Sequence, residues 1–365
     1  MLRNGFWAIF LIIMFLTGEL VAIYLNLPKL SLADNENNLN SAKTIKANLP
    51  NIIMPKVQAQ KNQESKPQQI LFVGDIMLDR NVEVLMKKNG DNYPFEKIKD
   101  FLADQDLVVA NLEGPIVKSP ENFGDHALKF AFAFQTSSIL KDNHINLISL
   151  ANNHTINMGQ KGLQETRDYL QADKIGAMGD PLLCTQDFIY AKDNLLFLGY
   201  NKTFSSGCPD QDILNGLKEA KLKNPDKFII VNMHWGKEYK TQNIEAQQIL
   251  AHELMDNGAD LIIGHHPHVV QNIELYKNKL IFYSLGNFIF DQYFSKNVQQ
   301  GLAVGLEIYK DKLVYAIYPL QSVKSQPSLM ADEDKTKFLA DLAARSSKEL
   351  GSQINLGKIE LKSNL

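Results

Sequence analysis

The chain has 365 residues, which suffices for one large or two ordinary domains, and its 38 basic and 41 acidic residues leave a net charge of −3. A charge this close to neutral gives no support for binding nucleic acid through the overall electrostatic field, and the sequence has no RNP, zinc-finger or helix-turn-helix signature. Glycine-rich phosphate loops are also missing, so the sequence does not support ATP chemistry.

The first predicted element is an apolar stretch near the N-terminus. Residues 6–25, FWAIFLIIMFLTGELVAIYL, are long enough to span a bilayer as a helix, and Arg3 before them favours a cytoplasmic start. We therefore expect residues 1–30 to be an uncleaved, single-pass anchor in the cell membrane, with the rest of the chain outside the cytoplasm. Glu19 within the span and the possible small-x-small cleavage site Ser31-Leu32-Ala33 leave a cleaved signal peptide as the alternative.

A polar linker and a folded domain are predicted to follow. Residues 31–68 are rich in Asn, Gln, Lys and Ser, which is typical of a flexible tether. Residues 69–325 are expected to fold as one α/β domain, because apolar runs alternate there with helical stretches such as 159–173 and 245–258.

Six apolar runs in this domain each stop at residues that can bind a metal ion or move a proton. Being apolar and rich in β-branched residues, the runs are predicted to be strands. The residues at their ends, in chain order, are Asp75; Asn111 and Glu113; Asn152, Asn153 and His154; His234; His265, His266 and His268; and Asn287. Because ligands bind at the carboxyl ends of strands in open α/β sheets, we expect these side chains to share one pocket.

Histidines are concentrated in the segment GHHPH, residues 264–268. Pro267 excludes a helix there and pushes His266 toward an extended conformation. Residues two apart in an extended chain point the same way, so His266 and His268 are expected to face one side and His265 the other. Two neighbouring imidazoles can hold a metal ion, although a polar loop with solvated histidines is the alternative.

Several of these residues also have ordinary structural explanations when they are taken singly. Asp75 could cap a following helix. The Asn152-Asn153 pair could form a turn. Glu113 could lie in a solvated loop, and His234 could be a hydrogen-bonded core histidine.

The end of the chain contains a hairpin pattern and a charged helix pattern. Residues 301–320 are predicted to form a β-hairpin that turns at residues 310–312, and residues 326–365 are predicted to be a C-terminal helix and tail. Earlier in the chain, Cys184 and Cys208 could form one disulfide in an exported domain or remain two thiols.

Six motifs in this order carry a family resemblance. They are GDIML, NLEGP, LANNH, HWGKEY, GHHPHVVQ and YSLGNFIFDQ, and the resemblance covers about residues 68–320. The pattern closely resembles that of the CapA proteins of capsule synthesis, the poly-γ-glutamate biosynthesis group, whose domain is similar to calcineurin-like metallophosphoesterases. This implies two packed mixed β-sheets flanked by helices, the four-layer sandwich of the metallo-dependent phosphatases.

The resemblance also implies roles for individual residues. Asp75 matches the first aspartate of the phosphoesterase pattern, and Glu113 stands where the bridging aspartate is expected, with Asn111 as the alternative. Asn153 and His154 match the Asn-His pair, in which asparagine binds metal and histidine assists the leaving group. The implied metal ligands are Asp75, Glu113, Asn153, His234, His266 and His268, and the implied catalytic residues are Asp75 and His154.

One position departs from the phosphoesterase pattern. Met77 stands where a histidine is expected two residues after the first aspartate, and a thioether is a poor ligand for hard divalent ions. We therefore expect one or two divalent metal ions of unequal affinity, with the weaker position relying on Asp75, Glu113 and His268.

Three functions of different classes remain open from the sequence. The first, implied by the resemblance, is a membrane-anchored, extracytoplasmic component of capsule or poly-γ-glutamate synthesis or export, with the cytoplasmic membrane and the polymer synthesis machinery as partners. The second is an exported metal-dependent phosphoesterase with an anionic polymer or a phosphoester as substrate and His154 as general acid. The third is a non-catalytic, polymer-binding scaffold.

Overall fold

The computed structural model describes residues 67–363 except 122, 125–127, 185–187 and 204–206. The predicted membrane anchor lies outside the described residues, as does nearly all of the predicted linker. Among the helices of the described part, none is both long enough and apolar enough to cross a membrane.

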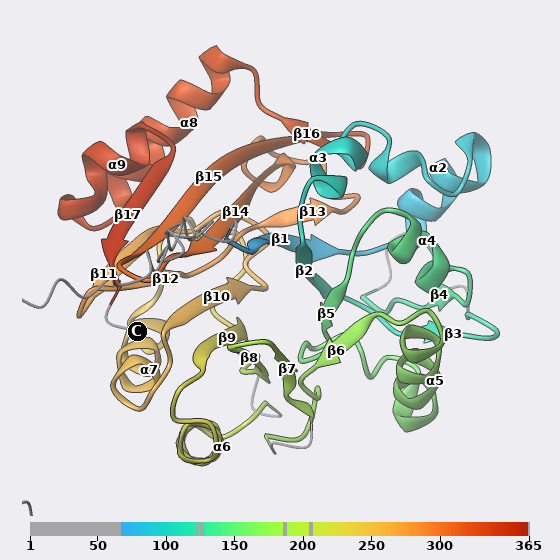
Figure 1. Ribbon diagram of the computed structural model, residues 1–365. Coiled ribbons are helices and arrows are strands. Elements are labelled where there is room, and N and C mark those ends of the chain that lie inside the picture. The colour runs from blue at the N-terminus through green and yellow to red at the C-terminus, as the bar shows by residue number, and fades with distance from the viewer. Residues whose placement is uncertain (1–66, 122, 125–127, 185–187, 204–206, 364–365) are drawn as a thin grey trace, which may run out of the picture. The chain divides into compact units, whose positions relative to one another are not determined.

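The larger of two main sheets has nine strands (Figure 1). Four parallel strands form one side of it and end at the edge strand β6: β1 (Gln69–Ile76), β2 (Leu107–Leu112), β5 (Leu147–Ser149) and β6 (Gly176–Met178). Beyond β1, antiparallel strands extend it: β14 (Gln300–Ile308), β15 (Lys312–Val323), β16 (Gln326–Leu329) and β17 (Lys358–Lys362). The short strand β13 (Asn287–Ile289) pairs in parallel with the end of β1.

The second sheet has six strands in the order β11-β12-β10-β9-β8-β7. Its parallel strands are β8 (Leu195–Asn201), β9 (Phe228–His234), β10 (Leu261–His265) and β12 (Lys279–Phe282). Antiparallel edge strands complete it: β7 (Tyr190–Lys192) and β11 (Ile273–Tyr276). A separate small pair consists of β3 (Ile116–Val117) and β4 (Phe132–Ala133).

The two sheets pack face to face, and helices cover their outer faces. Along β1, Ile70 and Phe72 enter the core between the sheets, whereas Leu71 and Val73 face the helices, as the two-residue repeat of a strand requires. The ring centroids of Phe72 and Phe197, one from each sheet, lie 6.5 Å apart. The predicted arrangement of two packed mixed sheets flanked by helices is therefore confirmed within the described residues.

The helices divide between the sheets. The nine-stranded sheet is covered by α2 (Arg80–Asn89), α3 (Lys99–Ala103), α4 (Thr136–Asp142) and α5 (Gly159–Ala172). The six-stranded sheet is covered by α6 (Asp210–Lys223) and α7 (Glu245–Asp256). Two more helices, α8 (Asp332–Arg345) and α9 (Gly351–Asn355), pack their apolar side chains into the core cluster that the two sheets share. Short 3₁₀ turns are η1 (Tyr93–Phe95), η3 (Asn297–Gln299) and η4 (Lys348–Leu350).

The structure differs from the sequence expectation at two places. The strand that starts at residue 279 was expected to end at Asn287, but β12 already ends at Phe282; Gly286 adopts a φ of +69°, and Asn287 begins β13 in the other sheet. Residues 326–365 contribute more than a helix and tail, since β16 and β17 both pair with β15. The predicted hairpin at 301–320 is confirmed as β14 and β15.

The two cysteines are joined. Cys184 and Cys208, which are 24 positions apart in the sequence, form a disulfide. Cys208 lies just before α6, and Cys184 follows the loop after β6. The disulfide therefore links two loops at the carboxyl ends of strands β6 and β8.

A candidate metal centre at the strand ends

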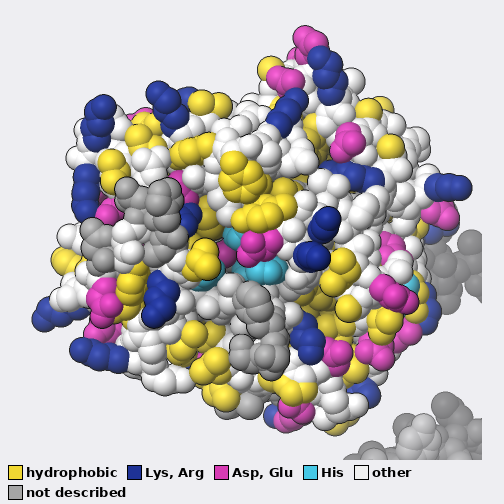
Figure 2. All heavy atoms as spheres, turned by 180° about the vertical axis from the view of Figure 1, so that it is seen from behind, with side chains coloured by type: hydrophobic (Ala, Val, Ile, Leu, Met, Phe, Trp, Pro, Cys, Tyr) yellow, Lys and Arg dark blue, Asp and Glu magenta, His cyan; other side chains and the backbone are white. Residues whose placement is uncertain are grey.

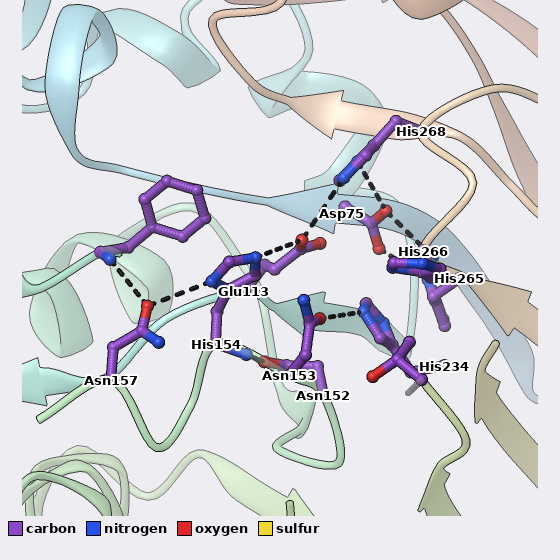
Figure 3. A network of polar contacts seen from close by, with 12 residues as sticks. Asp75, Glu113, Asn152, Asn153, His154, Asn157, His234, His265, His266 and His268 are labelled. Atoms are coloured by element: carbon purple, nitrogen blue, oxygen red, sulfur yellow. Dashed lines mark hydrogen bonds and ion pairs between the residues drawn. The ribbon is translucent and has the colours of Figure 1, made fainter. Parts of the chain in front are cut away.

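Polar side chains from both sheets converge where the carboxyl ends of their parallel strands meet (Figure 3). The nine-stranded sheet supplies Asp75 from β1, Glu113 after β2, and Asn153 and His154 after β5. The six-stranded sheet supplies His234, the last residue of β9, and the histidines at the end of β10. The structure thus brings together all seven residues to which the resemblance gave a metal-binding or catalytic role.

Two glycines allow the strand ends to approach each other this closely. A Cβ atom at Gly74 would lie 1.9 Å from the carbonyl oxygen of Gly286, and one at Gly264 would lie 1.9 Å from that of Tyr283. The backbone N–H of Asp75 donates to the Gly286 oxygen at 3.0 Å. Any side chain at Gly74 would therefore push Asp75 out of the cluster.

Asp75 is the hub of the cluster. It is fully buried, and its carboxylate accepts hydrogen bonds from Asn111 Nδ2 at 2.9 Å and from His265 Nδ1 at 3.2 Å. Burial alone would raise the pKa of Asp75, but hydrogen bonds from His265 and His268 hold it well below its usual value. Asp75 is therefore ionised. It does not cap a helix, because Asp79 caps α2.

Glu113 carries an oxygen that no described residue satisfies. Its side chain is fully buried, and Oε1 accepts no hydrogen bond within the described residues. The nearest imidazole nitrogens are His268 Nε2 at 3.6 Å and His154 Nε2 at 3.7 Å, both beyond hydrogen-bond distance. Burial raises the pKa of Glu113 well above its usual value. A buried carboxylate oxygen without a donor is costly, and a cation would satisfy it.

The histidine segment after β10 has a different shape from the one predicted. His266 and His268 adopt φ values of +95° and +57°, so the backbone is not extended there. Because β10 continues through His265 before the chain turns, the His265 side chain points into the cluster, and the expectation that it faces away was wrong. The three imidazoles all border the site, and the His266 ring centroid lies 5.0 Å from that of His234.

His234 and His268 are held by asparagine side chains. His234 Nε2 lies 2.8 Å from Asn153 Oδ1, and His268 Nδ1 lies 3.0 Å from Asn287 Oδ1. Burial lowers the pKa of His234 well below 6.5. For His268, burial would lower the pKa, but the charges of Glu113 and Asp75 raise it to about 9.

His154 stands at the edge of the cluster and is only partly exposed. Its Nδ1 lies 3.1 Å from Asn157 Oδ1, which also accepts a hydrogen bond from the Phe130 backbone. Since Asn157 Oδ1 is an acceptor, the proton of the neutral ring lies on Nδ1, and Nε2 faces Glu113 as an acceptor. Burial lowers the pKa of His154 to about 4, so this ring is neutral at pH 7.

Two groups of donor atoms lie close enough together to hold a divalent cation. Asp75, Glu113 and His234 form a fully buried group, whose ligand atoms lie within 4.8 Å of one another. His266, His268 and the exposed Glu238 form a second group at the same spacing. Carboxylate and imidazole ligands suit Mn²⁺, Zn²⁺ and Fe²⁺, so the residues present fit such an ion.

This division differs from the one that the resemblance implied. The weaker position was expected to rely on Asp75, Glu113 and His268, with a methionine in place of a ligand. Met77 is fully buried in the apolar cluster beneath the helices, and its sulfur accepts a hydrogen bond from Asp79 N at 3.1 Å. The carboxylate of Glu238, which was not predicted as a ligand, is found instead.

An open cavity of about 310 Å³ adjoins the cluster. Its lining residues come from several loops: Leu128, Asn152, Asn153, His154, Ile156, Asn157, Pro181, Leu182, Asn201 and Glu238. Figure 2 shows histidine side chains reaching the surface of this face beside an acidic side chain, with hydrophobic side chains above them. The site is therefore accessible from solvent, and Pro181 and Leu182 of its wall lie next to the disulfide-bonded Cys184.

A partly buried ion pair supports the rings that pack on two of the histidines. Arg80 pairs with Asp291, and its guanidinium lies 4.9 Å from the ring centroid of Phe130. The Phe130 ring in turn lies 4.4 Å from His154, and the Phe290 ring lies 4.8 Å from His268. Neither Asn157 nor the Arg80–Asp291 pair was predicted to support the site. Arg80 and Asp291 are far apart in the sequence, and Asn157 lies in an irregular turn after His154.

Comparison with known proteins gives a consistent family assignment. Residues 69–182 and 189–292 match the sequence profile of the family described as "Bacterial capsule synthesis protein PGA_cap". "Capsule biosynthesis protein CapA" of Bacillus anthracis is 30% identical over 330 residues, covering 83% of this chain and 80% of that protein. "PGA biosynthesis protein CapA" of Bacillus subtilis is 31% identical over 239 residues, and the match covers 60% of this chain and 63% of the Bacillus subtilis protein.

Solved structures are more distant. The purple acid phosphatase PPD1 from yellow lupin seeds is 12% identical, with a TM-score of 0.37, and the match covers 70% of this chain and 52% of that one. The structure of TT1561 from Thermus thermophilus is 14% identical, with a TM-score of 0.40, and the match covers 65% of this chain and 94% of that one.

Proposed function

Since this chain belongs to the bacterial capsule synthesis family PGA_cap, we propose that it acts in the synthesis or export of a capsule polymer of the poly-γ-glutamate type. The names of the two Bacillus relatives, one for capsule and one for PGA biosynthesis, support this role. Its partners are then the polymer synthesis machinery and the cytoplasmic membrane, and its substrate is an anionic polymer or a phosphoester.

The proposed location is outside the cytoplasm, with residues 1–30 as a single-pass membrane anchor. The apolar span at 6–25 supports this, and so does the disulfide between Cys184 and Cys208, because disulfides persist in oxidising compartments. A reporter fused after residue 68 should be active only if that reporter works outside the cytoplasm. Activity of a reporter that functions only in the cytoplasm would contradict the proposed location.

The proposed chemical role of the strand-end cluster is to bind divalent cations. The single observation that carries this is the buried Glu113 Oε1, which has no hydrogen-bond donor among the described residues and lies beside ionised Asp75. The residues that would hold a cation include the predicted ligands Asp75, Glu113, Asn153, His234, His266 and His268. A bound cation supplies a Lewis acid that polarises a substrate oxygen and lowers the pKa of bound water.

Metal-dependent phosphoester hydrolysis is a second candidate, which the position of His154 favours. This neutral imidazole lines the cavity and presents Nε2 toward Glu113, so it can take up a proton or, once protonated, give one to a leaving group. Asp75, whose carboxylate accepts hydrogen bonds from Asn111, His265 and the His266 backbone N–H, would keep the histidines oriented. Turnover of a generic phosphoester that is lost in His154→Asn would support this candidate.

The test of the proposed function is complementation. A strain lacking this gene should recover its polymer when it expresses the full-length chain, whereas Glu113→Gln should recover less than about a tenth of that amount. The matched control is Glu253→Gln, which changes an exposed carboxylate on α7 outside the cluster. Polymer is measured as glutamate released by acid hydrolysis of the capsule fraction. Full recovery with Glu113→Gln would leave a non-catalytic scaffold as the better description.

A further inference from the structure

The loop between β9 and α7, residues 235–243, is held in place by buried side chains and hydrogen bonds. At its start, Trp235 is buried, its backbone N–H donates to His265 O at 3.1 Å, and its indole N–H donates to Tyr283 O at 2.9 Å. The next residue, Gly236, has a φ of +91°, and a Cβ there would lie 2.6 Å from the Gln247 side chain. The turn therefore requires glycine, because of the positive φ and because a side chain there would contact Gln247 of α7.

The same loop is fastened to the segment that carries His266 and His268. The backbone N–H of Tyr239 donates to Pro267 O at 2.8 Å, between these two histidines. The Gln271 side chain donates to the carbonyl oxygens of Lys240 at 2.9 Å and Gln242 at 3.1 Å. The loop and the histidine segment are thus one cross-linked unit, which fixes the backbone at Glu238 relative to His266 and His268.

Glu238 lies one residue before the Tyr239–Pro267 hydrogen bond. One carboxylate oxygen of Glu238 and one nitrogen each of His266 and His268 lie within 4.8 Å of one another. Glu238 also lines the cavity and lies in the exposed part of the loop. A carboxylate opposite two imidazoles, open on one side to solvent, is a donor set for a divalent cation with room for a further ligand.

We propose that Glu238 is a metal ligand, which with His266 and His268 holds a second divalent cation at the wall of the cavity, beside the buried group of Asp75, Glu113 and His234. This inference rests on the proposed cation-binding role of the cluster. The weaker position was expected to rely on Asp75, Glu113 and His268 and to lack a ligand at Met77. In the proposed site, the carboxylate of Glu238 supplies the ligand that Met77 cannot.

The two positions differ in charge and exposure, which sets their relative affinities. The buried group contains two carboxylates and one imidazole, whereas the outer group contains one carboxylate and two imidazoles. The outer position therefore offers less negative charge and is open to water, so it should bind the weaker and more exchangeable ion. Its open side faces the cavity, where an anionic substrate group such as a carboxylate or phosphate has access.

The test measures metal binding and does not require any enzymatic activity. The full-length protein in detergent is stripped with a chelator and titrated with Mn²⁺ by calorimetry, and bound Mn²⁺ is counted by mass spectrometry after desalting. We expect wild type to show one tight and one weaker site per chain. Glu238→Gln should lose the weaker site, with at least about a tenfold drop in its affinity, and keep the tight one. Glu253→Gln is the control and should match wild type.

Each other outcome has a defined meaning. Two sites of wild-type affinity in Glu238→Gln would overturn the assignment of Glu238 and leave the proposed function standing, as would a single site in wild type that Glu238→Gln does not weaken. No Mn²⁺, Zn²⁺ or Fe²⁺ binding by wild type would overturn both. Because Glu238 is exposed, circular dichroism should show the same melting temperature for Glu238→Gln and wild type within about 2 °C.

Discussion

At the scale of single residues, one ionised carboxylate orders most of the histidines in the cluster. Asp75 lies 3.2 Å from His265 Nδ1 and 3.5 Å from His268 Nδ1. These contacts keep Asp75 charged in a fully buried place and help to keep His268 protonated. A cation that binds to His268 must displace this proton, so binding should release protons.

Replacing Asp75 tests this arrangement directly. In Asp75→Asn without metal, the pKa of His268 should fall from about 9 by roughly 1–3, because an opposite charge in contact has been removed. The measurement is an NMR titration of the histidine ring protons in the presence of a chelator. Glu253→Gln, which changes an exposed carboxylate outside the cluster, serves as the control. An unchanged His268 titration in Asp75→Asn would show that Asp75 does not set the charge of this ring.

The sequence predicted the residues of the site better than their arrangement. Asp75, Glu113 and His234 could be found because each follows an apolar strand, and parallel strands present their carboxyl ends at one edge. The contribution of His265 depends on where β10 ends, which Pro267 alone did not indicate. Glu238 was missed because it lies on a loop whose path is set by tertiary hydrogen bonds, not by a repeating pattern.

At the scale of elements, the site depends on how closely strand ends can approach. Gly74 and Gly264 each face a backbone carbonyl of the β12–β13 connection, residues 283–286. This connection carries the chain from one sheet to the other, which is why β12 ends at Phe282, before the end expected at Asn287, and why Asn287 begins a strand. The central strand β8 was not predicted at all, although its run LLFLGYN is apolar and short enough to be a buried strand.

A methyl group at Gly74 should therefore be costly. Gly74→Ala should lower the free energy of unfolding by about 2–4 kcal/mol, because its Cβ would meet the Gly286 oxygen at 1.9 Å and the contact is with rigid backbone. The matched control is Gly351→Ala, at the start of α9, where a Cβ would meet no described atom within 4 Å. Urea unfolding monitored by circular dichroism gives both values. Equal midpoints for the two variants would contradict the packing argument.

At the scale of the whole molecule, buried histidines set how stability depends on pH. His154 and His266 have pKa values lowered to about 4 and about 3, chiefly by burial. Their neutral forms stabilise the fold above pH 6.5, and this stabilisation is lost as pH falls toward those values. His268, whose pKa is raised to about 9, has the opposite effect. Its protonated form stabilises the fold fully below pH 6.5, and this stabilisation is lost as pH rises through 9.

The metal-free protein should therefore be most stable near pH 6.5. Relative to that pH, we expect a loss on the order of 1–3 kcal/mol at pH 9 and a loss of similar size at pH 4. Thermal unfolding across this range, with a chelator present, measures the profile. Adding Mn²⁺ should remove most of the loss at pH 9, since the cation takes the place of the His268 proton. A stability that rises steadily from pH 6.5 to pH 9 without metal would contradict the assigned charge of His268.

The pairing of β1 with β14 has a consequence for how the polypeptide is made. Gln69 and Glu307 are direct neighbours in the sheet although 238 positions separate them. Strand β15 in turn pairs with β17 at residues 358–362, near the end of the chain. During synthesis, the part of β1 that pairs with β14, Gln69–Phe72, has no partner on that side until the ribosome has passed residue 308. An unpaired apolar strand edge invites association between nascent chains. The growing chain must therefore be kept apart from its copies for most of its synthesis, and a chain that stops before β14 should accumulate as aggregates.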